Sequence, residues 1–207
     1  MESNNSREWP PMSASEAMTA AYKAFRSERS EWGRYSAESI EFCIRYGTDR
    51  IVQLWDVNFG CLGYDFRHES FDPWVGVRVD CETGVAVSFP PVEEVPSIGA
   101  ASGPIEFPAT VLNLLSAWQR LVNERGPALF TPQMTCDEAA EEYRRHCEQE
   151  GYDARPLRFC EFCVSVDDLG NVDRHWHLGP CDDDESGIDV DFIIDTYLVD
   201  DSTREVT

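Results

Sequence analysis

The sequence predicts an α+β protein built from two similar units, each a helix followed by an antiparallel sheet of three strands. Two observations carry this prediction. Short motifs recur in the same order about 120 residues apart, and in each half a capped helical pattern precedes segments of alternating apolar and polar residues. The expected divisions are a first unit at 1–90, a connecting loop and helix at 91–133, and a strongly acidic second unit at 134–207. We expect the units to share a core or to pack sheet against sheet.

The repeat consists of four pairs of matching segments. Residues 12–17 recur at 134–139, 41–44 at 161–164, Trp55 with Val57 at Trp176 with Leu178, and 79–83 at 199–203. One short match can arise by chance, but four matches in one order at nearly one offset indicate a duplication.

Each unit is expected to open with a helix, because each begins with a capping box. In Ser13-x-x-Glu16 and Thr135-x-x-Glu138 the hydroxyl can accept from a free backbone N–H of the first turn, while the glutamate reaches back to the cap residue. Apolar residues then follow at helical spacing, and most are small, which suggests helices lying close on a sheet. They are Ala14, Ala17, Met18, Ala21 and Phe25 in the first helix, and Cys136, Ala139, Ala140, Tyr143 and Cys147 in the second.

Strands are expected after each helix, since apolar and polar residues alternate with a period of two. The first strands are 40–46 and 162–166, the second 51–57 and 172–178, and the third 74–80 and 188–199, with a further strand at 85–89 in the first half. Hairpin turns are expected at 47–49 and 167–171. The last strand has one apolar face and one mostly acidic face.

The connector divides into a loop and a helix. Prolines and glycines from 90 to 108 predict a segment with little regular structure. Apolar residues from 111 to 122 then recur at helical spacing, and the pattern ends near Gly126-Pro127. We expect this helix to pack between the two units.

Composition and charge narrow the class of protein. The chain has 39 acidic and 17 basic residues, a formal net charge of −22, and 42% hydrophobic residues, enough for a packed core. Nucleic-acid backbone and anionic membrane repel a polyanion, so neither is an expected partner. Neither a secretory signal nor an apolar run near the roughly 20 residues of a membrane span is visible. We therefore expect a cytoplasmic protein whose eight cysteines are mostly reduced thiols.

The acidic charge is concentrated near the C-terminus. From 164 to 207 there are 13 acids and two bases, a net of 2 − 13 = −11, which is half of the total. This distribution predicts a docking face for a basic protein, with aromatic anchors beside it. The acids are Asp182, Asp183, Asp184, Glu185, Asp189, Asp191 and Asp195, and the anchors Trp176 and Tyr197. The alternative interpretations are solubility, protection of an edge strand, and adaptation to high salt, in which acids replace lysines over the whole surface.

A zinc site is the main alternative for chemistry, and its candidate ligands are Cys160, Cys163, His175, His177 and Cys181. Residues three apart on a regular strand point to opposite faces, so Cys160 and Cys163 reach one ion only across a bulge. A redox role for this pair is disfavoured because redox Cys-x-x-Cys motifs open a helix. A calcium loop begins at Asp182 but fails at position 12, where Ile193 stands.

His175-Trp176-His177 places two imidazoles on one strand face and the indole on the other. The pair could bind a metal or act as acid and base, but the sequence places no nucleophile beside it. Trp176 matches Trp55 in the repeat, which favours a core position for it. No phosphate-binding glycine loop, Gly-x-Ser-x-Gly or His-Glu-x-x-His motif is present, so we expect no enzyme and no cofactor, with zinc the alternative.

The order helix, strand, strand, strand, closed by Val79-Asp80-x-x-Thr83-Gly84-x-Ala86, resembles the PepSY-type unit and the small bacterial immunity domains of the YrhB kind. The resemblance covers both halves but not the connector, and the second half has Arg204 in place of the glycine. It implies a binding or inhibitory role and transfers no catalytic residue. The leading expectation is a non-catalytic acidic protein that neutralises a basic protein. A zinc- or calcium-binding protein, or a halophile domain whose acidity is solvent adaptation, are the alternatives.

Overall fold

A computed structural model describes residues 10–28, 35–47, 50–61, 74–89, 104–167, 169–180 and 196–207. Its helices are α1 (Ala14–Glu28), α2 (Ala109–Arg125) and α3 (Cys136–Glu150), with a 3₁₀ turn, η2 (Gly126–Phe130), after α2. Its strands are β1 (Tyr35–Tyr46), β2 (Ile51–Cys61), β3 (Trp74–Asp80), β4 (Ala86–Phe89), β5 (Leu157–Val166), β6 (Val172–Pro180) and β7 (Tyr197–Asp200). The fold is therefore of the α+β class.

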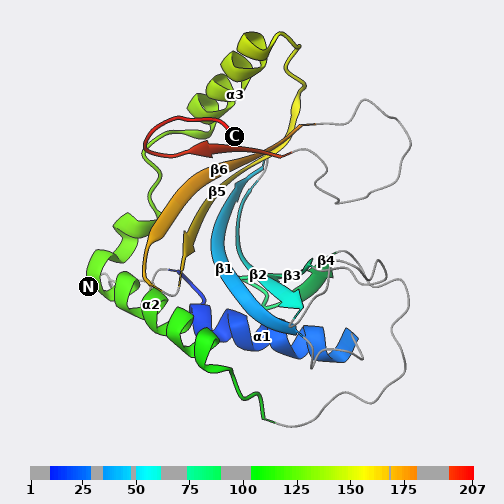
Figure 1. Ribbon diagram of the computed structural model, residues 1–207, viewed down its shortest axis with the longest axis vertical. Helices are drawn as coiled ribbons and strands as arrows, with labels where there is room; N and C mark the ends of the chain where they lie inside the picture. The colour runs from blue at the N-terminus through cyan, green and yellow to red at the C-terminus, as the bar shows by residue number, and fades with distance from the viewer. Residues whose placement is uncertain are drawn as a thin grey trace, which may run out of the picture.

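All seven strands form one antiparallel sheet in the order β4-β3-β2-β1-β5-β6-β7. Strands from the two halves of the chain meet at its centre, where β1 pairs with β5. The three helices lie against one face (Figure 1). There α1 contacts β2, β3 and β4, α3 contacts β5, β6 and β7, and α2 contacts β1 and β5. The two halves thus share one sheet and one core, which was one of the two expected arrangements. The connector helix α2 packs where the halves meet, in the place expected from the sequence.

The core lies between this face of the sheet and the helices. Three tryptophans, Trp55, Trp118 and Trp176, are its largest fully buried side chains. The rings of Trp55 and Trp118 meet edge to face with centroids 4.9 Å apart. Trp118 also donates from Nε1 to the carbonyl oxygen of Ile40 at 3.2 Å, so the α2 indole is tied to the central strand β1.

Both predicted capping boxes are present. At α3, the backbone N–H of Glu138 donates to Thr135 Oγ1 at 3.2 Å, and the backbone N–H of Thr135 donates to Glu138 Oε2 at 2.7 Å. At α1, the same two bonds join Ser13 and Glu16, at 3.3 Å and 2.9 Å. Each box satisfies backbone donors that a helix N-terminus otherwise leaves without partners.

Near the end of each half, a turn is built around an aspartate. Asp80 Oδ1 accepts from the backbone N–H of Thr83 at 2.7 Å, and Asp200 Oδ1 accepts from that of Thr203 at 2.5 Å. The residue after each threonine has a positive φ, 70° at Gly84 and 67° at Arg204. Arg204 therefore takes the glycine's conformation, so the turn is kept although the second half lacks the glycine.

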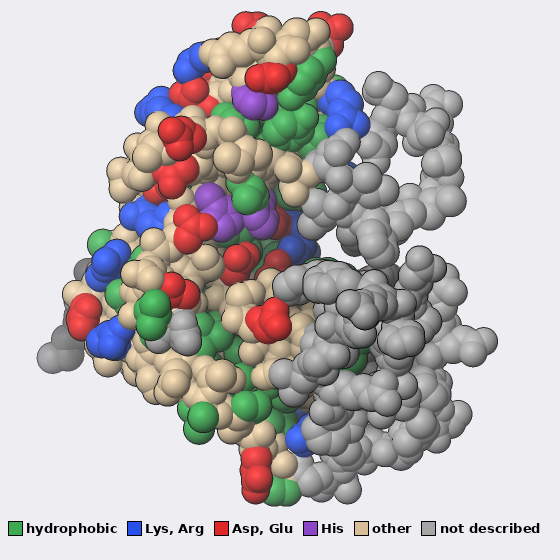
Figure 2. Space-filling model, in the orientation of Figure 1, with side chains coloured by type: hydrophobic (Ala, Val, Ile, Leu, Met, Phe, Trp, Pro, Cys, Tyr) green, Lys and Arg blue, Asp and Glu red, His purple; other side chains and the backbone are tan. Residues whose placement is uncertain are grey.

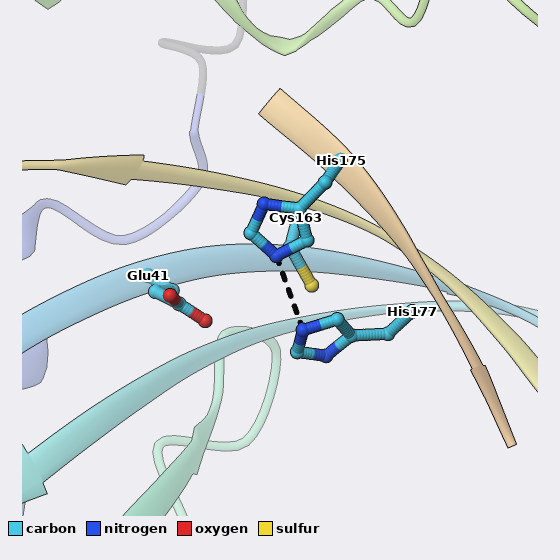
Figure 3. Close-up of side chains that lie close together, drawn as sticks. All are labelled: Glu41, Cys163, His175 and His177. Carbon is cyan, nitrogen blue, oxygen red and sulfur yellow. Dashed lines mark hydrogen bonds between the residues drawn. The ribbon is translucent and has the colours of Figure 1, made fainter. Parts of the chain in front are cut away.

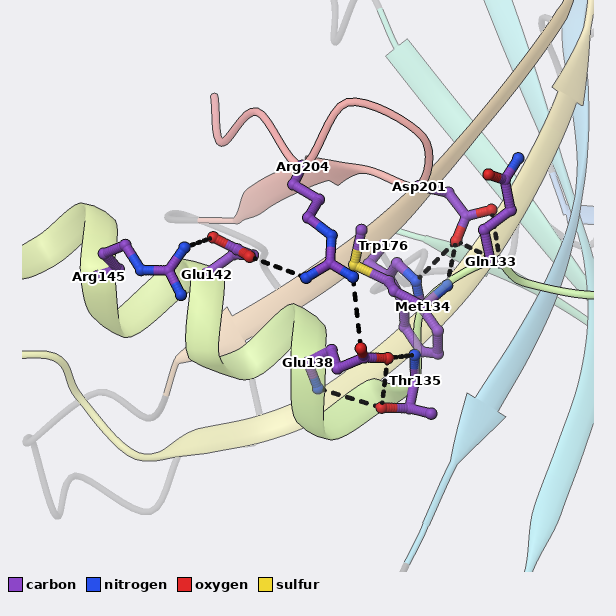
Figure 4. Close-up of polar contacts among 9 residues, drawn as sticks. All are labelled: Gln133, Met134, Thr135, Glu138, Glu142, Arg145, Trp176, Asp201 and Arg204. Atoms are coloured by element: carbon purple, nitrogen blue, oxygen red, sulfur yellow. Dashed lines mark hydrogen bonds and ion pairs between the residues drawn. The ribbon is translucent and has the colours of Figure 1, made fainter.

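The Arg204 side chain lies along α3 (Figure 4). Its guanidinium is 3.3 Å from Glu138 Oε1 and 3.3 Å from Glu142 Oε1. Three residues earlier in the chain, the buried Asp201 carboxylate accepts from the backbone N–H groups of Gln133 and Met134. The C-terminal turn is thus fixed to the start of α3.

The first and fifth strands are longer than predicted. Alternation predicts 40–46 and 162–166, whereas β1 begins at Tyr35 and β5 at Leu157. Each contains a register shift in the added part, between Ala37 and Ser39 in one and between Leu157 and Phe159 in the other. A bulge breaks the period of two, which is why the pattern did not extend through these segments. The predicted strand 188–199 is described only from 196 onward, and there β7 runs from Tyr197 to Asp200.

None of the helices in the described parts of the chain is both long enough and apolar enough to cross a membrane.

Candidate metal centre

The face of the sheet opposite the helices, here called the second face, carries polar side chains at its centre. Alternation sends Phe42, Phe162 and Trp176 into the core, so their neighbours on β1, β5 and β6 point the other way. The register sets Cys43 opposite Cys163, and Cys163 opposite His175. Figure 2 shows histidine side chains together near mid-height of the molecule, with acidic side chains close by.

Four potential metal ligands converge on this face: Glu41 from β1, Cys163 from β5, and His175 and His177 from β6 (Figure 3). One ligand atom from each residue lies within 4.8 Å of those of the other three. Cys163 is fully buried and His175 is buried, while Glu41 and His177 are half-buried. The four side chains therefore surround a small space on the sheet rather than extending into solvent.

The two imidazoles are held in place by hydrogen bonds. Asp173 Oδ2 lies 2.9 Å from Nδ1 of His175, and Nε2 of His175 lies 3.1 Å from Nε2 of His177. A proton on Nδ1 shared with the carboxylate leaves the lone pair of His175 on Nε2, where it accepts from Nε2–H of His177 and where a metal ion could bind instead. A carboxylate behind the imidazole is the usual support of a histidine that binds metal.

Burial and neighbouring charges move the ionisation of two of these groups. Burial raises the pKa of Glu41 to about 7, and the carboxylates of Asp56, Asp173 and Glu161 add to the effect. Burial also lowers the pKa of His177 to about 4, with a further contribution from His175. The imidazole of His177 is thus neutral at physiological pH, the form in which histidine binds a metal.

The carboxylates around the cluster outnumber the guanidiniums beside them. Asp56 pairs with Arg78 through two contacts, of 2.7 Å and 2.5 Å. The buried Glu161 contacts Arg45 and lies 3.6 Å from Arg78. With Glu41 and Asp173, these groups amount to four carboxylates and two guanidiniums, a charge of 2 − 4 = −2 when all are ionised. A divalent cation would offset that charge.

A second cluster shares one of these ligands. Ligand atoms of Cys43, Glu161 and Cys163 also lie within 4.8 Å of one another, and the two sulfurs are only 2.7 Å apart. The hydrogen bond to Cys163, together with burial, raises the pKa of Cys43 well above the ordinary thiol value. Burial raises the pKa of Cys163 to about 11. Both thiols therefore favour the protonated form, and neither has the lowered pKa of a catalytic thiolate.

The predicted zinc ligands divide into three groups. Cys163, His175 and His177 come together. Cys160 lies on the helix-facing side, with its sulfur 4.0 Å from the carbonyl oxygen of Cys136, so it cannot join them. This agrees with the rule that strand residues three apart face opposite sides. Cys181 lies outside the described residues, as do the calcium-loop candidates.

Glu41 was not among the predicted ligands. The sequence marks it only as a polar residue alternating with apolar ones, matched to Glu161 by the repeat. Its proximity to the histidines depends on the pairing of β1 with β5, which neither strand's pattern encodes.

The predicted partner-binding residues are placed less completely. The acids Asp182, Asp183, Asp184, Glu185, Asp189, Asp191 and Asp195 lie outside the described residues. Trp176 is fully buried in the core, so its proposed role as a surface anchor is wrong. Tyr197 is half-buried on β7, with its ring 4.8 Å from that of Tyr143.

No known protein family matches this chain, and no characterised protein or solved structure shows significant similarity to it.

Proposed function

We propose that this protein binds one divalent transition-metal ion, with zinc the best match, through Glu41, Cys163, His175 and His177. The observation that carries the proposal is the convergence of four ligand atoms of the kinds zinc prefers, all within 4.8 Å of one another. In a tetrahedral zinc site, neighbouring ligand atoms stand about 3.3–3.6 Å apart, given zinc–ligand bonds of about 2.0–2.3 Å. Small side-chain movements would bring this set to that spacing.

The donor set distinguishes among metals. Two imidazoles, a thiol and a carboxylate suit zinc and similar transition metals, whereas calcium and magnesium prefer sites made entirely of oxygen. The calcium loop suggested by the sequence at Asp182 lies outside the described residues and gains no support from this set. Asp173 behind His175 provides the outer support that such sites require.

The same residues are less suited to thiol catalysis. In a cysteine hydrolase an acid orients a histidine base, and that base activates a thiol. Asp173, His175 and Cys163 offer these three groups in that spatial order. The thiol of Cys163 is fully buried, however, and its pKa is raised to about 11, the reverse of an activated nucleophile. Four protein ligands would also leave zinc no open position for the water that a catalytic zinc site needs. Such a closed site is typical of structural, storage and regulatory zinc.

The proposal is tested by metal analysis of untagged protein purified without chelator. We expect about one zinc per chain, and loss of that zinc in His177→Gln but not in the control His146→Gln, whose histidine lies on α3. Replacement of zinc by cobalt should give a sulfur-to-metal charge-transfer band that Cys163→Ser removes. Folded protein that neither contains nor takes up zinc, and whose melting temperature zinc leaves unchanged, would overturn the proposal.

We also propose that the two halves are copies of one αβββ unit, related by an approximate two-fold axis between Cys43 and Cys163. These residues match in the repeat and lie opposite each other. The pairs beside them, Phe42 with Val164 and Ile44 with Phe162, exchange under the same operation. Further support comes from the similar φ angles at Gly84 and Arg204, 70° and 67°.

A second candidate function, binding of a basic protein, is favoured by the net charge of −22. Its support is electrostatic, so complex formation should weaken steeply as salt rises. Copurification of a basic partner at low salt, released at high salt, would support it. Association that is indifferent to salt would contradict it, and neither outcome bears on the metal site.

A further inference from the structure

The contact between Cys43 and Cys163 is closer than the packing of unbonded atoms. Their sulfurs share a hydrogen bond at 2.7 Å, shorter than the about 3.5–4.0 Å of van der Waals contacts between carbon atoms. The distance remains longer than the about 2.0 Å of a disulfide bond. Both side chains are fully buried within the sheet.

The backbone beneath the two sulfurs suits a covalent bond between them. Cys43 and Cys163 are directly opposite on the antiparallel strands β1 and β5. Opposite residues in such strands have Cα atoms about 4.5 or 5.5 Å apart, and both values fall within the disulfide range of about 4.4–6.8 Å. Two thiolates bound to one tetrahedral zinc would instead stand about 3.8 Å apart. The observed spacing favours the disulfide over joint ligation of one ion.

We propose that Cys43 and Cys163 form a reversible disulfide, and that this bond regulates the metal site by withdrawing Cys163 from it. The inference rests on the proposed zinc site, because Cys163 belongs to both clusters. A sulfur joined to Cys43 no longer carries the thiolate that zinc requires. Loss of one of four ligands weakens the site, and reduction restores it.

The oxidant that fits this pair is a small neutral peroxide, since both thiols are enclosed. The Cys43 sulfur attacks one oxygen of hydrogen peroxide, the O–O bond breaks, and Cys43 becomes a sulfenic acid as water leaves. The Cys163 sulfur then attacks the Cys43 sulfur, the S–O bond breaks, and a water leaves with the Cys163 proton. Where Cys163 starts as a metal-bound thiolate, hydroxide leaves instead. Two thiols are oxidised by two electrons, and one peroxide is reduced.

The test follows zinc and the cross-link together in the full-length, zinc-loaded protein. Hydrogen peroxide should release zinc to a chromophoric chelator in step with a Cys43–Cys163 disulfide found by non-reducing peptide mapping. Dithiothreitol should restore both thiols and the zinc. The larger glutathione disulfide should act much more slowly than peroxide, because the thiols are buried.

Matched variants separate the switch from general oxidation. Cys43→Ser keeps all four proposed ligands, so it should bind zinc and retain it through a peroxide exposure that empties the wild type. Cys147→Ser, a buried thiol on α3, should behave as the wild type. If Cys43→Ser does not fold, as judged by circular dichroism, peptide mapping of the wild type alone decides whether the bond forms.

The outcomes distinguish the two proposals. Zinc that binds but is not lost with a Cys43–Cys163 cross-link, or is lost equally fast from Cys43→Ser, overturns the switch and leaves the metal site standing. Protein that binds no zinc when fully reduced overturns the metal site and the regulation with it, whether or not mapping finds the disulfide.

Discussion

Arg204 and Gly84 hold the same left-handed backbone conformation, with φ of 67° and 70°, at positions 120 residues apart. Glycine adopts this conformation without cost, whereas an ordinary residue loses about 1–2 kcal/mol. Arg204 offsets part of that cost through its contacts with Glu138 and Glu142 on α3.

We predict that Arg204→Gly changes the free energy of unfolding by less than about 1 kcal/mol, because relief of the backbone offsets the loss of two surface ion pairs. Arg204→Ala loses the same ion pairs but keeps the strained backbone, so it should be less stable than Arg204→Gly by about 1–2 kcal/mol. Urea unfolding of both variants measures the order. An alanine variant as stable as the glycine variant would mean that the turn is unstrained.

Asp201 is expected to be among the most sensitive acids of the described chain. Its carboxylate is buried, accepts from the backbone N–H groups of Gln133 and Met134, and lies 2.9 Å from Arg174. In Asp201→Asn an amide N–H₂ would face those donors and the guanidinium would lose its partner. We predict a loss of about 2–4 kcal/mol in stability by chemical denaturation. The exposed Asp153→Asn serves as the control and should stay within about 0.5 kcal/mol.

The turn at Asp200 should contribute to the acid sensitivity of the protein. Hydrogen bonds from the backbone N–H of Thr203 and from Ser202 lower the pKa of Asp200 from 3.8 to about 2. A carboxyl whose pKa is lower in the folded state stabilises the protein above the unfolded value, and this contribution fades as pH falls from about 4 toward 2. Wild type should therefore exceed Asp200→Asn in stability at neutral pH, and the two denaturation curves should converge in acid. A difference that is constant with pH would contradict this account.

The proposed zinc site predicts a measurable role for Asp173, which contacts His175 but is not itself a ligand. Loss of such supporting carboxylates typically weakens metal binding about 10–100-fold. Asp173→Asn should show a weakening of that size in competition with a chelator, while Asp153→Asn should not. Unchanged affinity in Asp173→Asn would show that the histidine is oriented by other contacts.

Local features of the fold could be predicted from the sequence. Caps at Ser13 and Thr135 and the alternation along the strands depend on residues only a few positions apart. The early parts of β1 and β5 could not, because a bulge in each interrupts the alternation. The order of strands in the sheet could not be predicted either. The pairing of β1 with β5 joins segments 120 residues apart, and no sequence pattern marks two such strands as partners.

The candidate site follows the same division. The face shared by His175 and His177 follows from their spacing, and the separation of Cys160 from Cys163 follows from the strand period. Glu41 could be identified only once the two central strands were paired. The sequence suggested two positions for Trp176, in the core by its match to Trp55 and on the surface as an anchor. Its complete burial agrees with the first.

The pairing of β1 with β5 also sets an order of events as the chain folds. The hairpins β1–β2 and β5–β6 close between neighbouring segments, whereas Glu41 meets Cys163 only when a long loop has closed. Contacts of such sequence separation form slowly because the entropy of the loop must be lost first. A chain whose β1 has not yet paired with β5 cannot bring the four ligands together. Metal content would then measure how many chains have completed the central sheet.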